Sequence, residues 1–216
     1  MSLHGIMNGP NGQPAYYEVR NANREDPDEY GTVDKPQFLW AGAWYLNCLY
    51  QLYGVKDNGW NIALDPFLNE NQKACSLTLY VNGRLIILQI QGRGDVIEEI
   101  KYDKNMVNTA VFPEDLSDIN HVTVKLGILP KTPCLLSTES LLKSCIFKED
   151  YLKLTLKAYP GHSCESILIS PVKPESIEFN GNPFTGEWTC REYDGSYRII
   201  IQSIHTGNND ELVVMF

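Results

Sequence analysis

One apolar, aromatic segment near the start of the chain is followed only by sequence with the two-residue period of β-strands. Segment 34–53 carries apolar residues at helical spacing, with Trp40 and Trp44 widening the apolar surface beyond a single stripe. Asp34 can cap the first turn, and Gly54 suits the left-handed residue that ends a helix. The sequence therefore predicts one long helix that needs protein on several sides, although the chain supplies little other helical material.

The period changes to two beyond about residue 77. Leu77, Leu79 and Val81 alternate with polar residues, and Asn82-Gly83 predicts a two-residue hairpin turn. Further predicted strands are 85–90, 97–102, 107–112, 122–126, 152–158, 167–169, 176–179, 197–204 and 212–216. Because no crossover helices lie between them, the predicted fold is mainly β, with antiparallel β-sandwich domains preceded by the long helix.

Breaks in this pattern predict three regions. Residues 1–66 hold a loop rich in Gly, Pro, Asn and charge together with the helix, and residues 67–130 form a first β-sandwich layer or domain. Residues 131–216 form a C-terminal β-sandwich, set apart by the Pro130-Lys131-Thr132-Pro133 break.

Charge and hydropathy argue against two classes of partner. The net charge is −9 and no run of Lys or Arg exceeds two, whereas binding to nucleic acid draws on clustered cations. No stretch approaches the 18 or so apolar residues of a membrane span. The first residues show no signal peptide, so a cytoplasmic location is favoured.

The sequence predicts no metal, no cofactor and no catalytic residue. The six cysteines are scattered, which favours reduced, buried thiols, with a Cys164–Cys190 disulfide as the alternative. No phosphate-binding loop, nucleophile elbow or metal-ligand spacing occurs. The histidines are interpreted as strand-edge or loop residues: His4, His121, His162 and His205.

The aromatic and acidic N-terminal segment favours an oligosaccharide partner. Sugar rings stack their C–H faces on aromatic planes, and their hydroxyl groups bond to carboxylates and amides. Glu18, Gln37 and Trp40 are accordingly the candidate substrate-binding residues. The alternative is that the aromatic residues are core and Glu18 is a solvated loop acid.

Two motifs carry a resemblance to a known family. They are Asp34-x-Pro36-Gln37-Phe38-x-Trp40-x-Gly42-x-Trp44 and Trp60-Asn61-Ile62-Ala63-Leu64-Asp65-Pro66. Together they resemble the end of the six-hairpin α/α-barrel glycosidases, above all the cellobiose and chitobiose phosphorylases and the amylo-1,6-glucosidase-like hydrolases. Segments 81–83, 97–103, 111–113 and 121–124 are similar to the terminal β-layer of those enzymes, so the likeness covers about residues 14–127.

The resemblance implies that the helix is the last one of a catalytic barrel whose other helices, with the general acid, are not in this chain. In hydrolase members a carboxylate before the last helix acts as base, and Glu18 is the nearest candidate. Phosphorylases of this type place a Thr near the Gly-Ala-Trp position to hold phosphate, whereas 41–44 offers no hydroxyl, which counts against phosphorolysis.

Three hypotheses follow. In the first, the chain is the non-catalytic C-terminal part of a carbohydrate-active enzyme, a glycoside hydrolase or phosphorylase; it braces the barrel and contributes a substrate-side loop. In the second, it is an autonomous carbohydrate-binding module. In the third, it is a structural or interaction module of a bacterial multidomain protein. Under the first hypothesis the aromatic helix is expected either to cause self-association or to pack onto the chain's own sheet.

Overall fold

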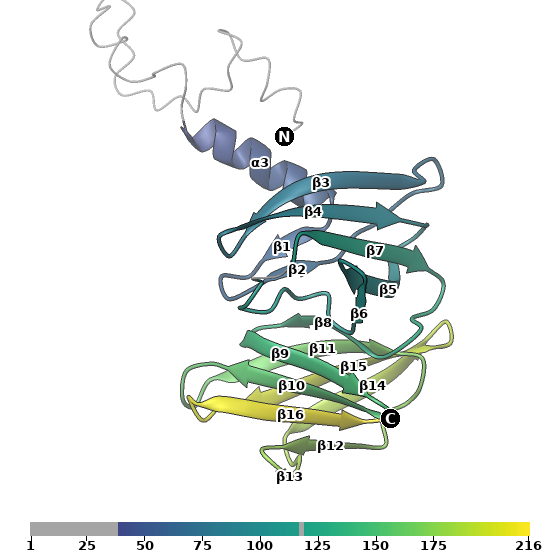
Figure 1. The fold of residues 1–216 in the computed structure, drawn as a ribbon. Helices are drawn as coiled ribbons and strands as arrows, with labels where there is room; N and C mark the ends of the chain where they lie inside the picture. Colours follow the sequence, from purple (N-terminus) through teal and green to yellow (C-terminus); the bar gives the residue numbers. More distant parts are fainter. Residues whose placement is uncertain (1–38, 117–118) are drawn as a thin grey trace, which may run out of the picture. The chain divides into compact units, whose positions relative to one another are not determined.

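The computed structural model describes residues 39–116 and 119–216 (Figure 1). The chain divides into two compact units, 1–52 and 53–216, which are treated separately below. In the described residues the first unit contains one helix, α3 (Leu39–Leu52), and the second contains strands. The protein is thus mainly β, as the sequence predicts.

Helix α3 lies inside the segment 34–53 that the sequence predicts as a helix. It has 14 residues and is the only helix among the described residues; predicted residues 34–38, including the cap Asp34, lie outside them. Gly54 has the positive φ predicted for a residue that ends a helix, +72°, and a Cβ there would lie 2.2 Å from the Asp65 carbonyl oxygen. Only glycine fits that position.

No helix in the described ranges is both long and apolar enough to cross a membrane.

Helix α3 exposes some of its large apolar side chains: Trp44 is 56% exposed and Leu52 is 66% exposed. Part of the apolar surface of the helix is therefore uncovered within the described chain.

The second unit begins with a small hairpin and a five-stranded sheet. The hairpin pairs β1 (Val55–Asp57) with β2 (Ile62–Leu64). In spatial order the sheet contains β3 (Ala74–Val81), β4 (Arg84–Gln91), β7 (His121–Gly127), β5 (Val96–Tyr102) and β6 (Asn105–Val107). Its pairings are antiparallel except that β4 and β7 run parallel.

Two further antiparallel sheets follow. One has the order β14 (Glu187–Tyr193), β15 (Ser196–Ile204), β11 (Ser163–Ser170) and β8 (Cys134–Thr138). The other has the order β13 (Asn182–Pro183), β12 (Ser176–Phe179), β16 (Asn209–Met215), β10 (Tyr151–Lys157) and β9 (Leu141–Lys148).

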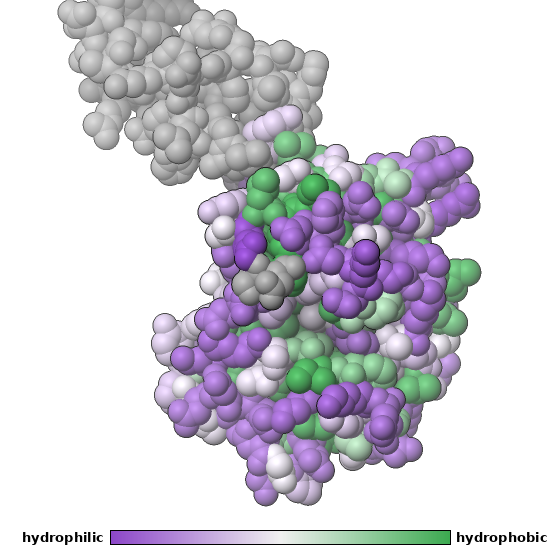
Figure 2. All heavy atoms as spheres, in the orientation of Figure 1, coloured by the Kyte–Doolittle hydropathy of each residue, from purple (hydrophilic) through white to green (hydrophobic). Residues whose placement is uncertain are grey.

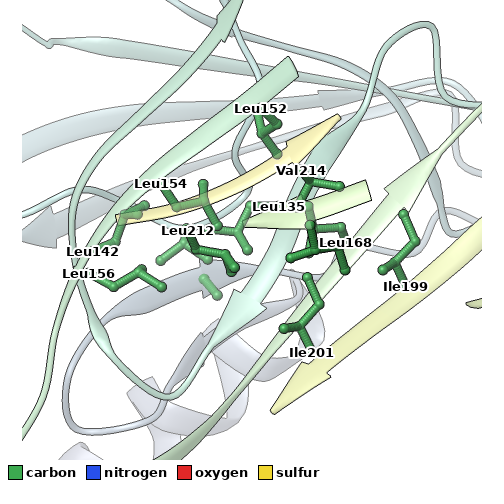
Figure 3. Packing of buried hydrophobic residues seen from close by; sticks show 13 residues of the cluster. Leu135, Leu142, Leu152, Leu154, Leu156, Leu168, Ile199, Ile201, Leu212 and Val214 are labelled. Carbon is green, nitrogen blue, oxygen red and sulfur yellow. The ribbon is translucent and has the colours of Figure 1, made fainter. Parts of the chain in front are cut away.

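These two C-terminal sheets share one hydrophobic core (Figure 3). Every second residue of β10 and β11 is buried, so each strand turns one face to the core. The labelled core residues are Leu135, Leu142, Leu152, Leu154, Leu156, Leu168, Ile199, Ile201, Leu212 and Val214. Aliphatic side chains from both sheets therefore hold the C-terminal region together.

Asn61 ties the β1–β2 hairpin to the start of both C-terminal sheets. Its buried Nδ2 donates to the carbonyl oxygens of Thr138 at 3.2 Å and Ser140 at 2.7 Å, and its Oδ1 accepts from the Leu142 amide at 2.9 Å. One side chain thus satisfies three backbone groups where the chain passes from β8 to β9.

Ion pairs hold the segment between the first sheet and β8. Lys131 Nζ lies 3.1 Å from a Glu98 oxygen and 2.5 Å from a Glu99 oxygen. Glu99 also accepts from Lys101, and these hydrogen bonds lower its pKa to about 2. The paired charges attach Lys131 to the outer face of β5.

Segment 107–112 was predicted as a strand, and the prediction is wrong apart from Val107 at the end of β6. Thr109 and Val111 instead make single bridges to Leu135 and Ala63, and Val111 is fully buried. The segment is apolar because it passes between neighbouring elements. Strands β8, β9 and β14 were not predicted, because burial does not alternate regularly along them.

We predict that Asn61→Ala lowers the free energy of unfolding by about 3 kcal/mol, since it removes the side-chain partner of the Ser140 carbonyl and the Leu142 amide and leaves the Thr138 carbonyl with Asn58 alone. For a chain of this length that is a fall of roughly 6–12 °C in Tm. Thermal unfolding followed by circular dichroism measures it. Asn71, which is exposed, provides the control variant Asn71→Ala, with an unchanged Tm. Equal Tm values for both variants would show that Asn61 is dispensable.

Candidate functional site

The predicted substrate-binding residues are not brought together by the described structure. Glu18 and Gln37 lie outside the described residues. Trp40 falls within α3, and its side chain is also outside what the structure describes. The oligosaccharide site predicted at these residues therefore stays a prediction.

The second unit has a cleft of about 700 Å³ beside the outer face of the β14–β15–β11–β8 sheet. We call it the interlayer cleft. It is lined by Lys56, Asn58, Ala63, Leu64, Asp65, Asp95, Val96, Ile97, Ile128, Leu136, Ser137, Ile167, Ile169, Tyr193, Asp194, Ser196 and Arg198. The first sheet and the β1–β2 hairpin supply one wall, and the C-terminal sheet supplies the other.

The floor of the interlayer cleft is apolar. Buried Leu168 of β11 faces the core, so its neighbours Ile167 and Ile169 point to the opposite face, where they are half-buried. Leu136 of β8 is also half-buried. A strand that is apolar on both faces is typical of a surface covered on both sides.

Charged groups surround this floor. Lys56 and Asp65 form an ion pair across the β1–β2 hairpin. Within the described chain, the side chains of Asp95, Asp194 and Arg198 form no hydrogen bond or ion pair, and all three residues are exposed. Two carboxylates and one guanidinium are thus available to a ligand.

Tyr193 brings an aromatic ring to the same cleft. It precedes the Asp194-Gly195 turn, whose φ values of 47° and 83° are typical of the tight hairpin turn predicted from the sequence. The ring is 56% exposed, and the turn lies against Leu129. An uncovered aromatic face beside charged groups can stack on the C–H face of a polyhydroxylated ring.

A second cluster has the geometry of a nucleophile triad. Ser140 Oγ lies 2.7 Å from His205 Nε2, and His205 Nδ1 lies 2.9 Å from Asp210 Oδ2. These distances match those between the nucleophile, base and orienting acid of hydrolytic enzymes. However, Ser140 is 0%, His205 2% and Asp210 1% exposed, so no substrate reaches the hydroxyl group. The cluster is a structural network.

Asp210 is the centre of that network. Its oxygens accept from the Thr206 amide at 3.0 Å, the Thr206 hydroxyl at 2.7 Å and Asn180 Nδ2 at 2.8 Å, in addition to His205. Burial by itself would raise the pKa of this carboxyl, but the hydrogen bonds from Thr206, Asn180 and His205 outweigh it and lower the pKa. The ionised carboxylate holds the β15–β16 turn closed.

The interpretation of His205 as a strand-edge or loop residue missed this network. The sequence did contain a signal, because His205 and Asp210 stand on either side of the predicted Gly207-Asn208 turn. Residues that flank a tight turn face each other, so a His and an Asp there can pair. Ser140, 65 positions away, could not be inferred in this way.

The described residues contain no group of three or more His, Cys, Asp or Glu side chains that could hold a metal ion. The six cysteines are free thiols, and burial raises the pKa of Cys134 to about 12. The interlayer cleft combines an exposed aromatic ring with two carboxylates and a guanidinium that form no ion pair within the described chain. Figure 2 shows that hydrophilic residues cover most of the described face in view, with smaller apolar areas between them.

Comparison with protein-family models, with curated proteins and with solved structures found no match to this chain.

We predict that Asp210→Asn lowers the free energy of unfolding by about 2 kcal/mol at pH 7, because hydrogen bonds to an ionised group are lost. The folded pKa of Asp210 is below its unfolded value, so its contribution is complete above pH ~4 and is lost as the pH falls through the folded pKa. The difference between the two proteins should therefore shrink in acid.

Urea unfolding of wild type and variant at pH 7 and at pH 3 measures this difference. The control is Asp150→Asn, since Asp150 is exposed and its side chain has no hydrogen bond within the described chain. A loss of stability that is the same at both pH values would contradict the ionised role of Asp210.

Proposed function

We propose that this chain is the non-catalytic C-terminal part of a carbohydrate-active enzyme and that its second unit binds oligosaccharide in the interlayer cleft. The observation that carries the proposal is the cleft itself, where exposed Tyr193 lies with the unpaired Asp95, Asp194 and Arg198. In this proposal the two C-terminal sheets are a β-sandwich, and α3 is the last helix of an α/α barrel.

The side chains of the cleft match the chemistry of a sugar. The Tyr193 ring provides a stacking surface for axial C–H groups. Carboxylates accept hydrogen bonds from hydroxyl groups, and a guanidinium donates to two neighbouring oxygens at once. Because the cleft carries both carboxylates and cations, its charge is nearly balanced, which favours a neutral oligosaccharide over an anionic one.

The motif 60–66, which carries part of the family resemblance, supports a bracing role. Asn61 joins this passage to the C-terminal sheets through its hydrogen bonds to Thr138, Ser140 and Leu142. Ile62 and Leu64 add backbone hydrogen bonds to segment 110–112 at 2.8–2.9 Å. In the parent enzyme, the passage that leaves the last barrel helix would thereby be anchored to the β-region.

Catalysis would come from elsewhere in the parent. Glycoside hydrolysis needs one carboxyl group that stays protonated and a second carboxylate across the same sugar. Asp95 and Asp194 are both exposed to solvent, whereas a general acid is commonly held in an apolar pocket. The cleft is thus a binding site in this proposal.

An autonomous carbohydrate-binding module is the second candidate. It is favoured by the compactness of unit 53–216, which has its own hydrophobic core. The two candidates differ in what the parent sequence contains, since the first requires a catalytic barrel before residue 34.

We predict that the full chain binds a neutral oligosaccharide and that Tyr193→Ala weakens the binding at least tenfold, a loss of about 1.4 kcal/mol. Isothermal titration calorimetry with malto-, cello- and chito-oligosaccharides measures it. Tyr80→Ala is the matched control, because Tyr80 is 67% exposed on β3 and does not line the cleft. Equal affinities for the two variants would exclude the cleft as the site.

We also predict that the chain alone releases neither free sugar nor sugar phosphate from these oligosaccharides, because the exposed Asp95 and Asp194 lack the apolar surroundings that keep a general acid protonated. A reducing-sugar assay and a phosphate-dependent assay test the two reactions. Product formation that Asp95→Asn or Asp194→Asn abolishes would show that the cleft is catalytic.

A further inference from the structure

The outer edge of strand β14 is long and uncovered. Six of its seven residues are exposed, with Cys190 half-buried. Its pairing with β15 runs from Glu187 to Tyr193 without a bulge. Such an edge offers a row of unpaired N–H and C=O groups, which natural proteins usually protect with a bulge, a proline or a lysine. Strand β14 has no bulge, proline or lysine, and its charged residues are Glu187, Arg191 and Glu192.

The opposite edge of the same sheet is covered. The Leu135 carbonyl oxygen of β8 accepts from the Ala110 amide at 2.7 Å, and the Leu135 amide donates to the Asn108 carbonyl at 2.8 Å. The Thr138 carbonyl is bonded by the side chains of Asn58 and Asn61. Within the described residues, β14 is therefore the open edge of this sheet.

We propose that two copies of this chain associate by pairing their β14 strands antiparallel, with Thr189 opposite Thr189 of the second copy. The sheet of each copy then continues into the other. In this register Glu187 of each copy lies opposite Arg191 of the other, and Trp188 lies opposite Cys190. The register follows from the charges along the strand.

The charges of β14 lie on the outer face of the sheet. Glu187, Thr189 and Arg191 are the partners of Gln202, Ile200 and Arg198 on β15, while Trp188 and Cys190 pair with the core residues Ile201 and Ile199. Arg191 thus stands directly opposite Arg198, a like-charge pair that is unfavourable on a sheet. The second copy's Glu187 would lie beside Arg191 and offset this repulsion.

Neighbouring registers lack this complementarity. If the pairing shifts by one residue, Glu187 lies opposite Glu192 of the second copy. If Cys190 instead lies opposite Cys190, then Glu187 lies opposite Tyr193. In both registers Arg191 has no acidic partner.

A hollow of about 480 Å³ near the strand has room for a second copy's side chains. It is lined by Gly186, Glu187, Trp188, Thr189, Ile200 and Gln202. The pairing would also cover Trp188, which is 38% exposed.

Sedimentation velocity of the full chain under reducing conditions, from low micromolar to near millimolar concentration, tests the proposal. We expect a concentration-dependent dimer, weak because one strand pair buries less than the roughly 1,200 Å² of a standard interface. Glu187→Arg and Arg191→Glu should each raise the dimer dissociation constant at least tenfold. A tenfold change corresponds to about 1.4 kcal/mol. The double variant Glu187→Arg/Arg191→Glu forms the same opposite-charge pair with the two signs exchanged, so it should restore the dissociation constant to within about threefold of wild type.

Glu192→Arg is the matched control, with the same charge change on the same strand but on the other face, and it should dimerise like wild type. Thermal unfolding checks that each variant is folded. Amide hydrogen exchange of 187–193 should slow with concentration in wild type, in Glu192→Arg and in the double variant, but not in Glu187→Arg or Arg191→Glu. A monomer at all concentrations, or a dimer that both single variants leave unchanged, overturns the proposal. Arg191 stands opposite the cleft residue Arg198, whereas neither Glu187 nor its partner Gln202 lines the interlayer cleft, so Glu187→Arg should weaken the dimer and leave oligosaccharide affinity unchanged.

Discussion

The three hydrogen bonds of the Asn61 side chain hold the β-region in its observed arrangement. They connect the β1–β2 hairpin with the turn between β8 and β9, where the chain passes from one C-terminal sheet to the other. The hairpin in turn supplies one wall of the interlayer cleft through Lys56, Asn58 and Asp65. The buried Asn61 carboxamide therefore helps to hold that wall in place, together with the hydrogen bond from Asn58 to Thr138 and the backbone bonds of Ile62 and Leu64 to segment 110–112. The aliphatic core holds the two C-terminal sheets together, whereas the hydrogen bonds of Asn61 help to position the β1–β2 hairpin relative to them.

Two polar clusters of the second unit differ in exposure, and exposure separates their roles. The Ser140–His205–Asp210 network has the distances of a catalytic triad but is sealed from solvent, so it stabilises the β15–β16 turn. The interlayer cleft has fewer internal contacts and leaves Asp95, Asp194 and Arg198 unpaired within the described chain. Groups that satisfy one another stabilise a fold, and groups left unsatisfied at a surface can meet a ligand.

The sequence predicted the parts of the fold that follow from local rules. The turns Asn82-Gly83, Asn180-Gly181 and Asp194-Gly195 have the positive φ angles expected of them, and the alternation along β10 and β16 places alternate residues in the core. Strand β14 escaped prediction because an exposed edge strand has no buried face and so no alternating pattern. The parallel pairing of β4 with β7 depends on contacts over more than 30 positions, which no local pattern encodes.

The interlayer cleft was also beyond prediction. Its lining comes from six separated parts of the chain, between Lys56 and Arg198, and only the folded chain brings them together. The sequence pointed instead to Glu18, Gln37 and Trp40, so the oligosaccharide partner is now proposed at a different surface. A crystal structure of the full chain with a bound oligosaccharide would show which surface the sugar occupies. We expect a sugar ring stacked on Tyr193, with its hydroxyl groups bonded to Asp194 and Arg198. A sugar bound at another surface, or an empty cleft at saturating oligosaccharide, would contradict it.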